Sequence, residues 1–203
     1  MATEKLKYDK TALKEQRDGL AKYRKFLPIL QLKKMQLQVV IRQLEPVINK
    51  KMAELSAIAE GSRPWSRLLT DPQVDIGDFL RVEEVRTETD NIAGVEVAEF
   101  QEVVFQDETY SLFATPSWLD KAVVNLRQMI AVREEIRVLQ EKENRIREEL
   151  RTTAQRCNLF EKKLIPELKE NIRKIKIFLG DQETAAVGRA KIAKAKTREL
   201  EVI

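Results

Sequence analysis

A heptad repeat of apolar residues runs through residues 6–58 and constrains the fold of this chain more than any other feature. Its a positions are Leu6, Leu13, Leu20, Leu27, Lys34, Ile41, Ile48 and Leu55. Its d positions are Asp9, Gln16, Tyr23, Leu30, Leu37, Leu44, Lys51 and Ile58. Most of these positions are apolar, and a narrow stripe with a period of 3.5 residues requires a partner helix rather than a broad globular core. The repeat therefore predicts a coiled-coil helix about 80 Å long, at 1.5 Å per residue.

Two prolines, Pro28 and Pro46, lie inside this pattern. A proline in a helix interior removes a hydrogen bond, crowds the preceding turn and costs about 3 kcal/mol. Two separate shorter helices are therefore one interpretation. Because the heptad phase continues across both prolines, we favour a kinked but continuous helix.

A second helical pattern follows Thr115, Pro116 and Ser117, which suit the N-cap and the first positions of a helix. A helix over residues 117–196 would be about 120 Å long. We expect it to fold back on the first helix as an antiparallel coiled coil within one molecule, with a kink at Pro166, where the apolar spacing changes. The predicted core positions of the pair are Leu20, Leu27, Leu30, Leu37, Ile41, Leu44, Ile48, Leu55, Leu150, Cys157, Phe160, Leu164, Ile172, Ile175 and Leu179.

The stretch between the helices has a different composition. Residues 79–105 are rich in valine and phenylalanine and alternate in places, as in Val95-Glu96-Val97, while Asp90-Asn91 and Gly94 supply turn residues. These features predict a β-hairpin.

The fold class predicted for the whole chain is mainly α. We expect a long antiparallel two-helix coiled coil with a small central domain that contains a β-hairpin and short helices. The expected segments are 1–60 (first helix), 61–115 (central domain) and 116–203 (second helix and basic tail).

Charge is distributed unevenly along the three segments. Residues 1–60 carry 13 Lys/Arg against 7 Asp/Glu, residues 61–115 carry 4 against 12, and residues 116–203 carry 20 against 14. This division suits contact with two different partner surfaces, or it simply keeps the protein soluble. The basic residues near the end are Arg189, Lys191, Lys194, Lys196 and Arg198. They form either a solvated, frayed tail, which composition alone favours, or a helix end that enters an acidic or polar socket.

Catalytic and cofactor-binding patterns are missing from the sequence. The chain has no histidine, no Gly-rich phosphate loop and no Cys/His spacing for a metal, so we expect neither an enzyme nor a cofactor. Its one cysteine, Cys157, cannot form an intramolecular disulfide and falls on the apolar stripe, where it suits core packing. The N-terminus lacks an apolar signal core, and no run approaches the roughly 20 apolar residues of a membrane span. We therefore expect a soluble, intracellular protein.

The block Arg156–Gln182 resembles the D subunit of V-type and archaeal-type rotary ATPases. The resemblance rests on Arg156, Asn158, Phe160, Glu161, Ile165-Pro166, Leu168, Ile172, Ile175 and Leu179. Residues 91–95 look like the mid-chain hairpin turn of that family, and the order of helix, small domain, helix and basic tail is similar over nearly the whole chain. Cys157 stands where valine is expected, and Ala98 where proline is common.

The resemblance implies a non-catalytic rotor shaft, or central stalk, in the cytoplasm and peripheral to the membrane. It implies that the partners are the catalytic A and B subunits of the ring, the smaller F subunit and a membrane-side socket subunit. It implies no nucleic acid, no membrane insertion, no small-molecule substrate and no cofactor. The residues expected in the bore of the ring are Leu6, Leu13, Arg189, Lys191, Lys194, Lys196 and Arg198.

Two other functions fit parts of the sequence. A homodimeric coiled-coil scaffold without a motor role would pair residues 6–58 between chains, and a measured molecular mass would separate it from a monomeric shaft. A nucleic-acid-binding rod would use the basic residues, but these alternate with glutamate along the second helix, and the basic tail contains no aromatic residue.

Overall fold

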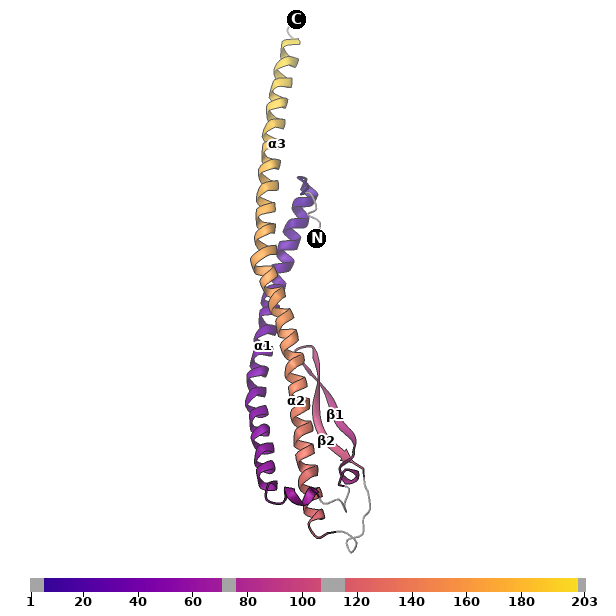
Figure 1. Ribbon diagram of the computed structural model, residues 1–203. Helices are drawn as coiled ribbons and strands as arrows, with labels where there is room; N and C mark the ends of the chain where they lie inside the picture. Colours follow the sequence, from indigo (N-terminus) through magenta and orange to yellow (C-terminus); the bar gives the residue numbers. More distant parts are fainter. Residues whose placement is uncertain (1–5, 71–75, 107–115, 201–203) are drawn as a thin grey trace. The chain divides into compact units, whose positions relative to one another are not determined.

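The computed structural model describes residues 6–70, 76–106 and 116–200. The first long helix is α1 (Lys10–Ser62), and the second long helical stretch consists of α2 (Leu119–Leu159), the π-helix η3 (Phe160–Leu164) and α3 (Ile165–Leu200). Between them lie two short 3₁₀ helices, η1 (Ser66–Thr70) and η2 (Asp78–Leu80), and the strands β1 (Val82–Ile92) and β2 (Val95–Phe105). The predicted fold class, two long antiparallel helices with a small hairpin between them in sequence, is confirmed (Figure 1).

The chain divides into two compact units. Unit 1 combines residues 1–32 with residues 153–203, and unit 2 comprises residues 33–152. In each unit, α1 runs antiparallel to the C-terminal helices (Figure 1). The segments predicted from the sequence, 1–60, 61–115 and 116–203, follow the order of secondary structure along the chain, and that division stays a prediction.

Helix α1 continues without a break across both of its prolines. It begins at a capped end, where Asp9 Oδ1 accepts a hydrogen bond from the Ala12 backbone N–H at 2.6 Å. Pro28 and Pro46 are both exposed. A proline on the solvent side of a helix is tolerated better, because the crowded carbonyl can tilt outward toward water. The interpretation as separate shorter helices is therefore wrong, and the continuous helix is confirmed.

The change of spacing around Pro166 takes the form of a π-helix. The backbone N–H of Ile165 donates to the carbonyl of Phe160, five residues earlier, at the end of η3. Pro166 has no N–H, and in an α-helix its ring would collide with the carbonyl four residues before it. The wider turn before Pro166 adds one residue to the helix and shifts its apolar face, which matches the altered spacing from Leu164 to Ile172.

The hairpin turns at Ala93 and Gly94. Both residues have positive φ, 52° and 77°, as a two-residue hairpin loop of type I′ requires. The register pairs Ile92 with Val95 and Asn91 with Glu96. Asn91 Oδ1 also accepts a hydrogen bond from the Gly94 N–H at 2.9 Å. The predicted turn residues Asp90 and Asn91 therefore lie at the end of β1, where Asn91 supports the turn from outside it.

Replacing Gly94 with alanine should lower the free energy of unfolding by about 1 kcal/mol, because a side chain at positive φ is strained. The nearest side-chain atom to an added Cβ is Lys33 Nζ at 3.9 Å, so the cost comes from the backbone and not from a clash. Urea unfolding followed by circular dichroism measures the change. Gly61→Ala is the matched control, since Gly61 lies within α1 and has nothing within 4 Å of an added Cβ. Equal stability of the two variants would contradict the turn assignment.

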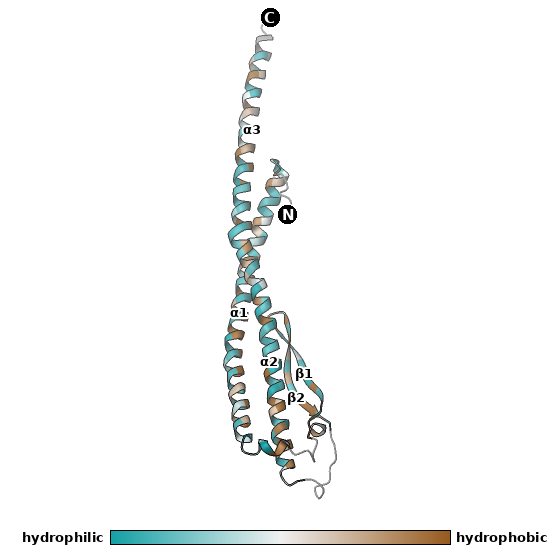
Figure 2. Cartoon of the chain, viewed as in Figure 1, coloured by the Kyte–Doolittle hydropathy of each residue, from teal (hydrophilic) through white to brown (hydrophobic). Residues whose placement is uncertain are grey.

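The core of unit 2 joins the hairpin to both long helices. Leu37 and Ile41 of α1, Val97 of β2 and Ile146 of α2 are buried in one cluster. Partly buried apolar residues around this cluster are Val40, Leu44, Ile92, Ala93, Val95 and Leu150. Figure 2 shows hydrophobic residues alternating with hydrophilic ones along these elements. The cluster explains why β1 and β2 are ordered, because an isolated two-stranded hairpin is marginally stable in water.

Arg127 fixes the other end of the hairpin. Its guanidinium donates to the carbonyl of Phe79 at 3.1 Å and to the carbonyl of Gln106 at 3.2 Å. It also lies over the ring of Phe105, 5.1 Å from the centroid. One half-buried side chain of α2 thus contacts η2 and the last residues of the hairpin.

In unit 1 the two ends of the chain pack together through aromatic and polar contacts. Tyr23 meets Phe160 with ring centroids 4.8 Å apart, and Tyr8 meets Phe178 at 5.1 Å. Asn171 Nδ2 donates to Gln16 Oε1 at 3.3 Å. Residues later in the first helix contact residues earlier in the C-terminal helices. This is the antiparallel pairing expected from the sequence.

Candidate functional site

The end of α3 is the most exposed helical segment of unit 1. Residues 180–197 are exposed throughout, apart from the half-buried Gly188. Even the large apolar side chains Val187 and Ile192 are 56% and 60% exposed. Alanine residues at 185, 186, 190, 193 and 195 favour a helix without tertiary support. Such a segment is either solvated or available to a partner.

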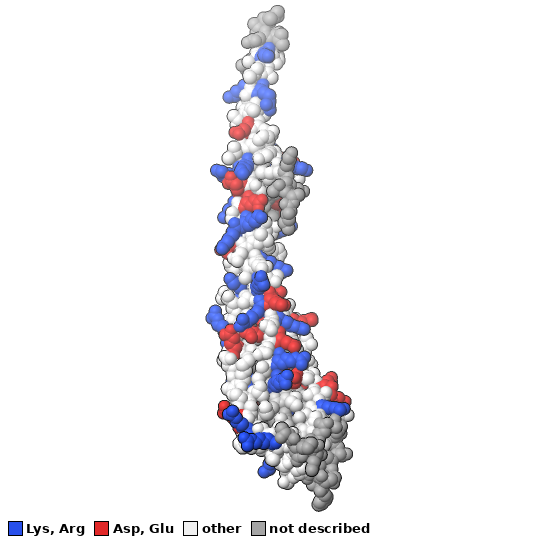
Figure 3. Space-filling view, in the orientation of Figure 1, with Lys and Arg blue, Asp and Glu red and all other residues white. Residues whose placement is uncertain are grey.

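The predicted ring-contact residues form two separate groups. Leu6 and Leu13 are half-buried, and Tyr8 between them in sequence contacts Phe178. The basic group begins at Arg189, which at 1.5 Å per residue lies about 16 Å further along α3 than Phe178. Arg189, Lys191, Lys194 and Lys196 are exposed, and Arg198 belongs to α3 but its side chain lies outside the described residues. Figure 3 shows mainly blue side chains toward this end of α3.

Every predicted core position of the coiled coil is either buried or half-buried. The buried ones are Leu37, Ile41, Ile48, Cys157 and Ile175. The half-buried ones are Leu20, Leu27, Leu30, Leu44, Leu55, Leu150, Phe160, Leu164, Ile172 and Leu179. Their burial within the chain leaves little of this stripe free to pair with a second copy.

Ion pairs between α1 and α2 accompany the apolar contacts in unit 2. Lys33 Nζ lies 2.7 Å from Glu149 Oε1, and Lys51 Nζ lies 2.9 Å from Glu135 Oε2. Sequence reasoning missed these pairs. The pair of Lys51 could have been predicted, because a lysine at a d position of a coiled coil needs a carboxylate on the facing helix. The hydrogen bond to Glu135 raises the pKa of Lys51 above its ordinary value. The stabilisation is therefore present across the physiological range and is lost as pH rises through the raised pKa.

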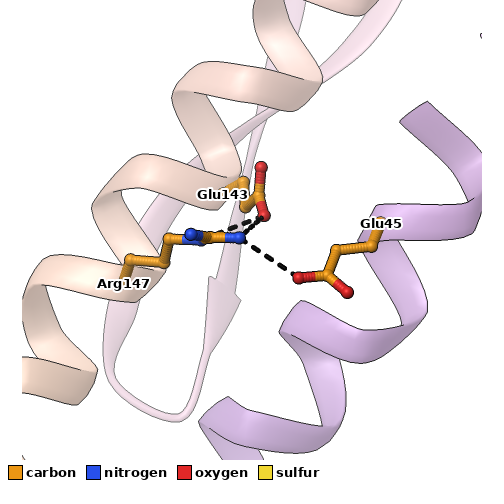
Figure 4. Close-up of polar contacts among 3 residues, drawn as sticks. All are labelled: Glu45, Glu143 and Arg147. Atoms are coloured by element: carbon orange, nitrogen blue, oxygen red, sulfur yellow. Dashed lines mark hydrogen bonds and ion pairs between the residues drawn. The ribbon is translucent and has the colours of Figure 1, made fainter. Parts of the chain in front are cut away.

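A third contact between the helices lies nearer the surface. Arg147 donates to Glu45 of α1 at 3.1 Å and to Glu143 of α2 at 2.6 Å (Figure 4). The side chains of Arg147 and Glu45 are 54% and 52% exposed, so the pair between the helices contributes less than about 1 kcal/mol.

The described residues contain no arrangement suited to metal binding. No group of three or more His, Cys, Asp or Glu side chains within them could hold a metal ion. Among the same residues, no helix combines the length and the apolar character that crossing a membrane requires.

Together, these features define a class of protein: a helical hairpin that carries a small β-hairpin and exposes a basic helix end. The model of the family described as the D subunit of ATP synthase matches residues 12–195. The chain belongs to this family.

Curated relatives carry the same family name over nearly their whole length. The D subunit of the V-type ATP synthase from Borreliella burgdorferi is 39% identical over 191 residues, covering 94% of each chain. The D subunits of the V-type ATP synthases from Chlamydia caviae and Chlamydia felis are 34% and 35% identical over 196 and 199 residues. Those alignments cover 96% of this chain and 94% of each relative. The resemblance predicted from the sequence is confirmed.

Proposed function

We propose that this chain is the central-stalk rotor subunit of a V-type or A-type rotary ATPase. In this role it couples ATP hydrolysis or synthesis in a ring of A and B subunits to ion translocation across the membrane, and it has no catalytic residue of its own. The family match over residues 12–195 carries the proposal, because it spans both long helical stretches and the hairpin.

The coupling requires a shaft that resists twisting and presents different surfaces to the ring as it turns. The buried stripe around Leu37, Ile41 and Ile146 supports stiffness, since a helix pair with an interlocked core cannot twist without losing contacts. The ring's nucleotide-dependent states favour different shaft angles, and turning the shaft changes nucleotide affinity by the same coupling free energy. The uneven charge of the chain supplies the required asymmetry.

The partners follow from the same proposal. The exposed basic end of α3 enters the bore of the A and B ring, together with the N-terminal residues Leu6 and Leu13. The acidic central segment, residues 61–115, faces the membrane-side socket subunit, and the smaller F subunit binds the side of the shaft. The chain then lies in the cytoplasm, peripheral to the membrane.

Native mass spectrometry of the assembled complex tests this proposal. Co-expression of a tagged chain with the A, B, F and socket subunits of the same organism should give one copy of this chain per ring. Omitting the chain should leave a ring that cannot drive ion movement. A tagged chain that purifies as a homodimer and does not associate with the ring would overturn the rotor role and favour the scaffold.

A further inference from the structure

The core positions of the C-terminal helices follow a heptad repeat in two blocks. In the first block, steps of four, three, four and three connect Ile146, Leu150, Thr153, Cys157 and Phe160. In the second block, steps of three, four, three and four connect Ile165, Leu168, Ile172, Ile175 and Leu179. Every one of these residues is buried or half-buried. Each block by itself is therefore a regular coiled-coil stripe.

One extra residue separates the two blocks. The step from Phe160 to Ile165 is five residues, where a continuing heptad repeat requires four. The π-helix η3 lies at this step, and the hydrogen bond from the Ile165 N–H to the Phe160 carbonyl spans the same five residues. A π-turn takes one more residue than an α-turn, so η3 absorbs the extra residue and keeps both blocks on one face.

The helix pair of unit 1 is thinly packed around η3. Residues 158–174 of the C-terminal helices include no buried residue, whereas the adjoining Cys157 and Ile175 are 4% and 0% exposed. On the facing part of α1, residues 13–32 also include none. Both ranges lie within the described residues. A stretch of the C-terminal helices about 25 Å long, at 1.5 Å per residue, thus contains no fully buried side chain.

An amide pair and a glycine lie in the second half of this stretch. Asn171 Nδ2 donates to Gln16 Oε1 at 3.3 Å, so polar groups occupy part of the contact between the helices. Gly19 of α1 lies beside Leu168, since a Cβ added to Gly19 would be 3.7 Å from Leu168 Cδ1. At that position α1 contributes no side chain, so less apolar area is buried than a larger residue would bury.

Unit 2 differs from unit 1 in both kinds of contact. In unit 2, Leu37 and Ile146 are fully buried, and Lys51 of α1 pairs with Glu135 of α2 at 2.9 Å. In the part of unit 1 that the structure describes, no ion pair joins α1 to the C-terminal helices, and Glu170 pairs only with residues of α3. Few buried contacts lower the free energy that local opening requires.

We infer that residues 158–174 form a compliant joint, where the helix pair opens locally while the buried cluster of unit 2 stays packed. The extra residue creates the joint, because the chain has to leave regular α-helical geometry to keep the second block on the facing helix. Pro166 fixes the joint in place, because it cannot donate the hydrogen bond that a regular α-helix needs at that position. The inference concerns the chain by itself and does not rest on the proposed function.

Hydrogen exchange of the purified full-length chain, followed by mass spectrometry, measures local opening. We expect the amides of the joint to exchange at least about tenfold faster than those of residues 132–150 in α2. The amides next to the buried Ile175 should exchange more slowly than the joint, which separates an internal joint from fraying of the helix end. Equal protection of the joint and residues 132–150, or protection that falls steadily from Cys157 to the end of α3, would overturn the inference.

Deleting Lys163 together with Pro166→Ala removes both the extra residue and the proline. The step between the blocks becomes four residues, so a continuous α-helix can bury both blocks. Lys163 and Pro166 are exposed, and the change therefore removes no buried side chain. We expect the protection of the joint amides to rise at least about tenfold and the melting temperature of the chain to rise with it.

Two variants are matched controls for this deletion. Pro166→Ala alone keeps the extra residue, so the joint amides should remain poorly protected. Deleting the exposed Lys169 together with Pro166→Ala removes the same residue type and the same length. It leaves Ile165 and Leu168 out of phase with the rest of the repeat, so its melting temperature should lie below that of the Lys163 deletion. If the Lys163 deletion melts no higher than the Lys169 deletion, or if its joint amides keep wild-type exchange rates, the extra residue does not create a joint and the inference is overturned.

Discussion

Removing residues 185–203 should leave a complex that still hydrolyses ATP but moves far fewer ions per ATP. In the deleted segment, residues 185–197 are exposed apart from the half-buried Gly188, and the last buried residue in the described part of the chain is Ile175. The truncated chain therefore keeps its core and its contacts between α1 and the C-terminal helices. What it loses is the basic segment that we place in the bore of the ring.

The measurement compares ATP hydrolysis with ion uptake in vesicles that contain the complete reconstituted complex. We expect the ratio of ion uptake to ATP turnover to fall several-fold, while the melting temperature of the isolated chain stays unchanged. A variant with Lys191, Lys194 and Lys196 replaced by glutamine separates charge from length, because it keeps the helix end and removes three positive charges. Full coupling in the truncated complex would count against a role of this segment in the ring.

Replacing Ile146 with aspartate should unfold the packing of unit 2. Ile146 is fully buried and touches the cluster that joins α1, α2 and the hairpin. The substitution removes an apolar side chain and buries a carboxylate without a partner, so the expected loss exceeds about 4 kcal/mol. Urea unfolding should show the loss, and the hairpin amides should exchange with solvent much faster.

Val124→Asp is the control for this prediction. Val124 lies on the same helix but is 65% exposed, so the same chemical change should alter the free energy of unfolding by less than about 0.5 kcal/mol. If Ile146→Asp were as stable as Val124→Asp, the cluster would not be the core of unit 2.

The helices could be predicted because their signal is local and repeated. Positions such as Leu37, Ile41 and Ile48 recur at heptad spacing, and a stripe of that kind requires a facing helix. The hairpin could be predicted from Val95-Glu96-Val97 and the glycine at position 94. Its exact turn could not, because Ala93 adopts positive φ only when the flanking strands and Asn91 hold it there.

Other features depend on distances that a sequence pattern does not contain. A helix can accommodate a proline in several ways, and the π-helix before Pro166 is one of them. Phe160, the first residue of this π-helix, packs against Tyr23. The pairs Lys33–Glu149 and Lys51–Glu135 join residues far apart in the chain.

Rotation of the chain inside the complex tests the central claim most directly. A bead attached to a cysteine introduced at Glu83, an exposed position of β1, reports the motion when the A and B ring is fixed to a surface. The native Cys157 is 4% exposed and should not react with the label. On addition of ATP, we expect the bead to turn in one direction with pauses that reflect the near-threefold ring. If the intact complex hydrolyses ATP while the bead never turns, the rotor role of this chain is contradicted.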